Sequence, residues 1–284
     1  MTGASCPARP RRVHPGLYKQ HTELARPCAP GTTQVTITLH ALTFHALVEI
    51  KHGGTAPSVL GPPDKVEARL REAFPAGFST DRAAFCDTLT QLGPSPALPN
   101  DCVDVGVEGA PCSDARVVLL RLTSPEARAW HARLAPLVLF FIDAGTHLNT
   151  ECVPACVLAS SLAHAAPHSC VPCRKDNKWE LLVALLPGTG GSGTHVVAGF
   201  ATLYRFYAFP EGTRLRLSQV LVLHPMQRRG VASTLLQAVR RVAVTSSAVD
   251  YTVEDPTDAL QKLRVRASHL NSGACQKHPS PHRR

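Results

Sequence analysis

The chain has 284 residues, of which 44% are hydrophobic, so it can bury a core as one large or two small domains. Residues 1–20 and 262–284 hold ten of the 30 lysines and arginines and no acidic residue, so the formal net charge of +9 comes from the two ends. We expect no membrane span and no secretory signal, because no 18-residue stretch is continuously apolar and no apolar run follows the N-terminus.

Without a secretory signal, the ten cysteines are expected to be thiols or metal ligands rather than disulfides. We interpret the basic ends as solvated tails. Contact with nucleic acid, a nuclear address and an organelle transit peptide remain open alternatives for them. We expect no sequence-specific binding of nucleic acid.

The secondary structure is expected in the following order. Residues 1–31 are rich in Pro, Arg and Cys and are predicted to be disordered. Strands are predicted at 33–50 (two strands), 115–122, 178–186, 195–209, 213–224 and 250–253. Helices are predicted at 64–74, 80–92, 124–141 and 230–242, the third capped by Ser124 with Pro125 behind it. Strands and helices mix without regular βαβ alternation, which favours an α+β fold with a mixed sheet and helices on its faces.

The junction after the apolar run 217–223 reads HPMQRRGVASTLL and enters a predicted helix. A helix N-terminus offers unpaired backbone N–H groups and the positive end of the helix dipole. Gly230 lets the backbone approach a ligand closely, and Arg228 and Arg229 add positive charge. The pattern predicts a pyrophosphate site. It is neither GxxxxGK[ST] nor GxGxxG, so it is not that of a nucleotide-hydrolysing P-loop or a dinucleotide-binding turn.

Gln227-Arg228-Arg229-Gly230-Val231-Ala232 resembles the Q/R-x-x-G-x-G/A element of the GNAT acetyltransferases. Residues 197–236 resemble the core of the type B histone acetyltransferases in a tyrosine-rich strand, a P-E-x-T-R turn and an S-Q dipeptide. FPAGFSTDRAAF (74–85), the helix around 130–143 and DYTVEDP (250–256) extend the resemblance over roughly residues 33–266. It implies a GNAT fold with a mixed central sheet flanked by helices and an N-terminal α/β region.

The resemblance also implies a division of the chain. The expected parts are a basic tail (1–31), the N-terminal α/β region with the central helix (32–143), a Cys-rich insertion (144–177), the acetyl-CoA-binding catalytic domain (178–268) and a second tail (269–284). Acetyl-CoA is the implied co-substrate. Its implied contacts are Val220, Leu221, Val222, Gln227, Arg228, Arg229, Gly230, Val231, Ala232 and Ser233.

Acetyl transfer to a lysine needs a base, because the amine is protonated at neutral pH, with a pKa of ~10.4. By resemblance, Glu254 is the lead base and Asp255 assists it. Strand alternation is expected to point these two side chains to opposite sides. Asp143 stands where the family has a site glutamate and is one methylene shorter. Without the resemblance, all three carboxylates would read as solvated loop groups.

Tyr204, Arg205 and Phe206 match the family's substrate-recognition segment, which there reads Tyr-Asn-Tyr. Trp179 falls at a family position near the lysine channel, although a core aromatic residue on a strand explains it equally well. A basic histone tail favours an acidic groove. That groove could come from Asp143, Glu180, Glu254, Asp255 and Asp258.

The insertion carries a second signal. Cys152, Cys156, Cys170 and Cys173 follow the spacing C-x3-C-x13-C-x2-C, close to that of a zinc ribbon. The alternative is a cysteine-rich surface loop without metal, and the family resemblance supports no zinc site here.

The resemblance implies an enzyme that acetylates lysines of newly made histone H4 in a ternary complex, without a covalent enzyme intermediate. It implies a WD-repeat histone chaperone as partner, and the nucleus and cytoplasm as locations. Two alternatives stay open. One is a GNAT enzyme acting on another amine. The other is a degenerate protein that binds histone or coenzyme A without turnover, which the short C-terminus and Asp143 motivate.

Overall fold

The computed structural model describes residues 17–22, 34–52, 65–92, 98–143, 145–148, 178–188 and 194–272. The chain forms two compact units, residues 1–96 and 97–284. Within the described residues, no helix combines the length and the apolar character that a membrane crossing requires.

The first unit is a small antiparallel sheet with two helices. Its strands pair in the order β1 (Leu17–Thr22), β2 (Gln34–His40) and β3 (Ala46–Lys51). Its helices are α1 (Val66–Ala73) and α2 (Arg82–Leu92). The pairing of β1 with β2 shows that the prediction of disorder for residues 1–31 is wrong at β1. The composition of residues 1–31 predicted a tail. Composition does not show that the edge of a neighbouring strand is available for pairing.

The core of the first unit comes from alternation along β2 and from one apolar face of each helix. Val35, Ile37 and Leu39 are buried at every second position of β2, as a strand with one covered face requires. Leu70 of α1 and Phe85 of α2 are the buried residues of their helices. The predicted pair of strands in residues 33–50 and the two predicted helices are confirmed in type and place.

The second unit is built on a mixed sheet of six strands in the part of the chain that the structure describes. The order is β4 (Val103–Asp104), β5 (Arg116–Arg121), β6 (Trp179–Pro187), β7 (His195–Ala208), β8 (Gly212–Val222) and β9 (Asp250–Val253). Every neighbouring pair is antiparallel except β8 and β9, which run parallel. The expected mixed sheet is confirmed, and β4 is a short strand that was not among the predicted elements.

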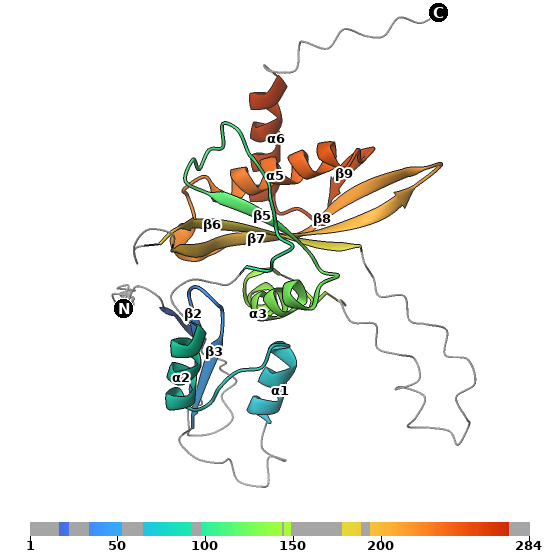
Figure 1. Cartoon of the computed structure of the whole chain (residues 1–284). Helices are drawn as coiled ribbons and strands as arrows, with labels where there is room; N and C mark the ends of the chain where they lie inside the picture. The colour runs from blue at the N-terminus through green and yellow to red at the C-terminus, as the bar shows by residue number, and fades with distance from the viewer. Residues whose placement is uncertain are drawn as a thin grey trace, which may run out of the picture. The chain divides into compact units, whose positions relative to one another are not determined.

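Helices cover both faces of this sheet (Figure 1). Helix α3 (Pro125–Phe141) lies on one face, and its N-cap Ser124 accepts a hydrogen bond from the amide of Ala127 as predicted. Helix α5 (Val231–Thr245) lies on the other face, with α6 (Asp258–Ser272) packed against it. A short 3-10 turn, η2 (His224–Met226), joins β8 to the approach of α5. Helix α6 continues to Ser272, slightly beyond the expected end of the ordered region.

The core of the second unit lies between the sheet and α5. Leu182, Leu203 and Leu215 from three strands pack with Leu235 and Val239 of α5, and all five are fully buried. Burial of this size stabilises the fold by about 1.5–3 kcal/mol for each large side chain. The packing fixes the N-terminus of α5 at the end of β8, where the candidate site lies.

Candidate active site

Strands β8 and β9 form one edge of the sheet and separate partway along β8. Their parallel pairing runs from Arg214↔Asp250 to Leu217↔Val253, where β9 ends. Strand β8 continues to Val222, still paired on its other side with β7. Beyond Leu217, the edge of β8 is therefore left open by β9. The predicted cofactor residues Val220, Leu221 and Val222 lie along this open edge, where a bound molecule can add like a strand.

Two contacts hold β9 against β8, one at each end of their pairing. The guanidinium of Arg214 donates two hydrogen bonds to Asp250, at 2.6 and 2.9 Å, which raises the pKa of Arg214. At the other end, the amide of Glu254 donates to the carbonyl of Leu217 at 2.9 Å. The end of β9, and with it the start of the following turn, is thereby held against β8.

The N-terminus of α5 closes the open end of β8. Gly230 is the N-cap of α5 in the left-handed conformation, with φ +84°, and no side chain caps the first turn of the helix. Gln227, Arg228 and Arg229 are exposed before it, while Ala232 is half-buried behind it. Uncapped N–H groups beside two cations suit the pyrophosphate of coenzyme A. Val231 is buried and belongs to the core, and Ser233 is half-buried in the first turn.

The loop before β5 packs against this helix N-terminus, a contact that sequence analysis missed. The hydroxyl of Thr234 accepts a hydrogen bond from the amide of Cys112 and donates one to the carbonyl of Gly230, both at 3.2 Å. Thr234 is fully buried. A Cβ on Gly230 would lie 2.9 Å from the backbone of Pro111. The partners are 122 residues apart in sequence, so no local pattern signals the contact.

We expect Gly230→Ala to destabilise the second unit by about 1–3 kcal/mol, because alanine takes up strain at positive φ and meets the backbone of Pro111. The shifted helix N-terminus should also raise the dissociation constant for acetyl-CoA about tenfold, equivalent to about 1.4 kcal/mol. Thermal unfolding and calorimetric titration measure the two effects. Gly106→Ala is the matched control, since a Cβ there meets nothing within 4 Å. Equal effects of the two substitutions would contradict this account.

The two carboxylates after β9 lie in a bend. Glu254 and Asp255 are both exposed, and Asp255 has φ +34°. We predicted that strand alternation would point their side chains to opposite sides. That reasoning does not apply, because β9 ends at Val253 and neither residue lies in a strand. Glu254 Oε2 instead accepts a hydrogen bond of 2.6 Å from the hydroxyl of Ser218. This contact directs the Glu254 carboxylate toward the point where β8 and β9 separate.

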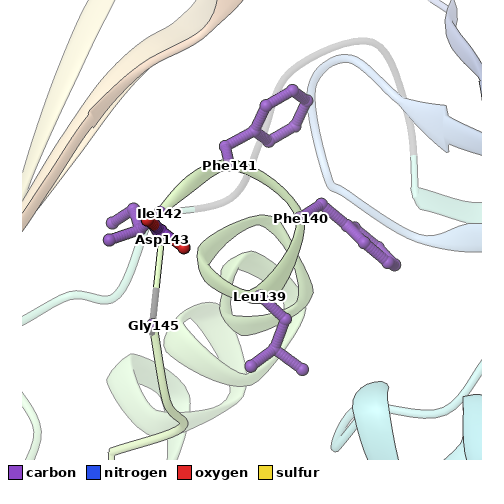
Figure 2. Close-up of a pocket in the computed structure, with 6 residues that line it drawn as sticks. All are labelled: Leu139, Phe140, Phe141, Ile142, Asp143 and Gly145. Carbon is purple, nitrogen blue, oxygen red and sulfur yellow. The ribbon is translucent and has the colours of Figure 1, made fainter.

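Asp143 lies just beyond the C-terminus of α3 and lines a pocket of about 400 Å³. Figure 2 shows Leu139, Phe140 and Phe141 spreading outward from the last turn of the helix, with Ile142 and Asp143 next along the chain. The carboxylate of Asp143 is exposed. Asp143 is the acidic residue among those that line the pocket.

A buried glutamine connects the segment after α3 to β8. The side-chain amide of Gln219 donates to the carbonyl of Thr146 at 2.9 Å. Its own backbone amide donates to the hydroxyl of Thr202 on β7 at 3.1 Å. Gln219 is 8% exposed and Thr202 is fully buried. In the sequence the S-Q dipeptide is visible only as a family feature, because the contacts of Gln219 with Thr202 and Thr146 are long-range.

Helix α3 itself carries a buried histidine. His131 is 4% exposed, and burial, together with the nearby His147, lowers its pKa from 6.5 to about 4. Between these values the unfolded chain binds a proton that the folded chain rejects. The free energy of unfolding is therefore complete above about pH 6.5 and falls as the pH drops toward 4.

We expect the second unit to lose about 2 kcal/mol of unfolding free energy between pH 7 and pH 5 through His131 alone, at 1.4 kcal/mol per pH unit. Urea unfolding at a series of pH values measures it. His131→Gln should flatten that slope, whereas His224→Gln, at an exposed position, should leave it unchanged. A wild-type slope retained in His131→Gln would show that other groups cause the dependence.

An aromatic cluster lies where β6, β7 and β8 run side by side. Tyr204 contacts Trp179 and Phe206 edge to face, with ring centroids 4.7 and 4.5 Å apart. The guanidinium of Arg216 lies 4.4 Å from the centre of the Phe206 ring. The structure thus brings together three of the four predicted substrate-binding residues.

Arg205 points away from that cluster. Strand alternation places it on the face opposite to Tyr204 and Phe206. Its Nη2 forms an ion pair at 2.9 Å with Oε2 of Glu180, whose side chain is only 5% exposed. Arg121 lies 4.0 Å from the other oxygen of Glu180. Glu180 is therefore engaged within the protein rather than available to an acidic groove.

The four candidate zinc ligands, Cys152, Cys156, Cys170 and Cys173, lie outside the described residues. In the part of the chain that the structure describes, no three or more His, Cys, Asp or Glu side chains come together as a metal site would require.

Two family models match the chain. Residues 32–143 match the model described as histone acetyl transferase HAT1 N-terminus. Residues 158–263 match the model of the acetyltransferase (GNAT) family, which covers the open edge of β8 and the N-terminus of α5. Members of the GNAT family use acetyl-CoA, which agrees with the geometry of this site.

The chain is also similar to curated proteins that are named as type B histone acetyltransferase subunits. The chain is 25% identical over 243 residues to the histone acetyltransferase type B catalytic subunit of Arabidopsis thaliana, covering 82% of this chain and 47% of that protein. It is 31% identical over 159 residues to the Zea mays protein of the same name, covering 55% and 29%. The chain therefore spans about half the length of the Arabidopsis thaliana protein and less than a third of the Zea mays protein.

A solved aminoglycoside acetyltransferase from an uncultured soil metagenomic sample matches at 13% identity and a TM-score of 0.33, covering 60% of this chain and 95% of that chain. The chain thus combines a match to the N-terminal domain of a histone acetyltransferase with a match to the GNAT family that follows it, and it is similar to type B histone acetyltransferase catalytic subunits.

Proposed function

We propose that this protein transfers an acetyl group from acetyl-CoA to lysine side chains of newly made histone H4. One observation carries the proposal: the open edge of β8 and the carboxylate of Glu254 meet at the point where β8 and β9 separate. A cofactor arm along Val220–Val222 would end beside this carboxylate.

When bound, acetyl-CoA supplies an acetyl group activated as a thioester. The backbone of β8 would orient the pantetheine arm, and the N-terminus of α5 at Gly230 would hold the pyrophosphate. The side-chain amide of Gln227 donates a hydrogen bond of 3.1 Å to the carbonyl of Val222. This contact holds the segment before α5 at the end of the open edge.

Glu254 would act as the general base. The hydroxyl of Ser218 holds Oε2 of Glu254, which leaves Oε1 to accept a proton from the lysine ammonium. The neutral lysine nitrogen would then attack the carbonyl carbon of the thioester directly, without a covalent intermediate on the protein. The C–S bond would break, and coenzyme A would leave as the thiol with the proton that the attacking nitrogen loses. Asp255, next in the bend, and Asp143, in its pocket beside the end of α3, are the proposed assisting carboxylates.

The aromatic cluster of Trp179, Tyr204 and Phe206 suits the aliphatic stem and the positive charge of a lysine, because aromatic faces attract cations. The pairing of Arg205 with Glu180 supports the proposal as well, since it neutralises a cation that would otherwise repel a basic histone tail. We also propose a WD-repeat histone chaperone as partner, and action on newly made histone in the cytoplasm and nucleus.

The test is acetylation of a histone H4 tail peptide by the purified chain with acetyl-CoA, with spermidine as a competing small amine. Preference for the peptide by kcat/KM supports the proposal. Preference for spermidine would indicate a GNAT enzyme acting on another amine. Binding of acetyl-CoA without product from any amine would identify a degenerate binding protein.

A further inference from the structure

A β-bulge interrupts the pairing of β7 with β8 beside the site. Thr202 pairs with Gln219, and Leu203 pairs with Leu217, so Ser218 is an extra residue on β8. Bulges of this kind redirect side chains and occur often next to active sites. Here the bulge lies at the last residue pair that β8 forms with β9.

Ser218 holds a segment that follows it in the chain. Its hydroxyl donates to Oε2 of Glu254, 36 residues downstream, at 2.6 Å. Glu254 lies in a bend and is exposed, so rotation of its side chain is otherwise unrestricted by packing. The hydroxyl of Ser218 therefore selects one orientation of this carboxylate.

Gln219 holds a segment that precedes it. The hydroxyl of Thr202 donates to the side-chain oxygen of Gln219 at 3.4 Å, which leaves the side-chain nitrogen to donate to the carbonyl of Thr146, 73 residues upstream. The buried amide thus has a defined orientation. Through this hydrogen bond, β8 fixes the position of Thr146 in the segment that follows α3.

The turn that contains Asp143 ends at this anchor. The amide of Gly145 donates to the carbonyl of Ile142 at 2.9 Å and closes the turn. A Cβ on Gly145 would lie 2.8 Å from the carbonyl oxygen of Val138, so the turn packs directly on the last turn of α3. Asp143 is therefore held between the end of α3 on one side and the contact of Thr146 with Gln219 on the other.

We propose that Ser218 and Gln219 are positioning residues that align two carboxylates for the same reaction, Ser218 acting through Glu254 and Gln219 acting through Asp143. The inference rests on the proposed function, in which these carboxylates serve acetyl transfer. Two adjacent residues at one bulge thereby set the positions of two segments that are remote in sequence.

Kinetics of the single variants give the first readout. Ser218→Ala should lower kcat about 10- to 100-fold with little change in KM for acetyl-CoA, as loss of a hydrogen bond to a charged group implies. Gln219→Met, which keeps the length of the side chain, should lower kcat about tenfold. Ser218→Thr keeps the hydroxyl and should restore most of the activity. Ser113→Ala and Gln91→Met, at exposed positions, are the matched controls.

Double-variant cycles separate positioning from a structural role. The effect of Ser218→Ala should disappear in a Glu254→Gln background and persist in an Asp143→Asn background. The effect of Gln219→Met should disappear with Asp143→Asn and persist with Glu254→Gln. If Gln219→Met loses acetyl-CoA binding, Gln219→Glu takes its place in the same cycle.

If Ser218→Ala and Gln219→Met each lower kcat by the same factor in the Glu254→Gln and Asp143→Asn backgrounds, the positioning proposal is overturned. The proposed function would still stand. The absence of turnover in the wild-type chain would overturn both. Unchanged kcat in Ser218→Ala and Gln219→Met would overturn the positioning proposal alone.

Discussion

Replacing Glu254 by glutamine is expected to lower kcat for acetylation of a histone H4 tail peptide by about 10²- to 10⁴-fold, the usual contribution of general acid–base catalysis. Glutamine fills the same space and can still accept a hydrogen bond from Ser218, but it cannot take up a proton from the lysine. The dissociation constant for acetyl-CoA should remain unchanged, since the proposed cofactor contacts lie on β8 and α5. Steady-state kinetics and calorimetric titration together measure both quantities.

Two controls make this result specific. Glu211→Gln applies the same chemical change at an exposed residue in the β7–β8 turn and should not alter kcat. Asp255→Asn, next to Glu254 in the bend, should lower kcat less than Glu254→Gln does. Full activity in Glu254→Gln together with loss in Asp255→Asn would move the base to Asp255.

Replacing Arg205 by methionine is expected to lower the free energy of unfolding by about 3 kcal/mol, because it leaves the carboxylate of Glu180 buried without its close partner. The Glu180 side chain is 5% exposed and that of Arg205 is 26% exposed, so solvent screens the pair weakly. The 2.9 Å contact lacks the alignment of a good hydrogen bond. Arg205 therefore stabilises Glu180 mainly through its charge. Urea unfolding measures the loss.

The double variant Arg205→Met/Glu180→Leu should recover most of this stability, within about 1 kcal/mol, since no charge then remains buried. Arg121→Met is the matched control. Arg121 is 66% exposed and lies 4.0 Å from Glu180, so its removal should cost less than about 1 kcal/mol. A loss in the double variant as large as that in Arg205→Met would assign the effect to packing of the arginine stem instead.

Local signals in the sequence predicted the elements well. Ser124 with Pro125 marked the start of α3, and the apolar Tyr251 and Val253 marked β9. Gly230 marked the end of the junction before α5, where the backbone does take up positive φ. These features depend on neighbours a few residues away, so sequence spacing is enough to reveal them.

The contacts that shape the candidate site could not be predicted in this way. Thr234 meets Cys112, and Gln219 meets Thr146, only after the sheet has brought separate segments together. The family resemblance suggested that Arg205 faces the substrate, yet the alternation of β7 turns it toward Glu180. The separate roles of Asp143, Glu254 and Asp255 remain predictions that the kinetic experiments address.

The order in which the sheet forms follows from its connections. Strands β7 and β8 join through residues 209–211, whereas β9 can pair with β8 only after the chain has passed through α5. Closing the short turn costs less conformational entropy than closing the longer crossover. A chain made from its N-terminus also completes β8 before Glu254 has been synthesised. The proposed cofactor surface is therefore assembled before the proposed base, so a nascent chain that stops between α5 and β9 would have the open edge of β8 but would lack Glu254.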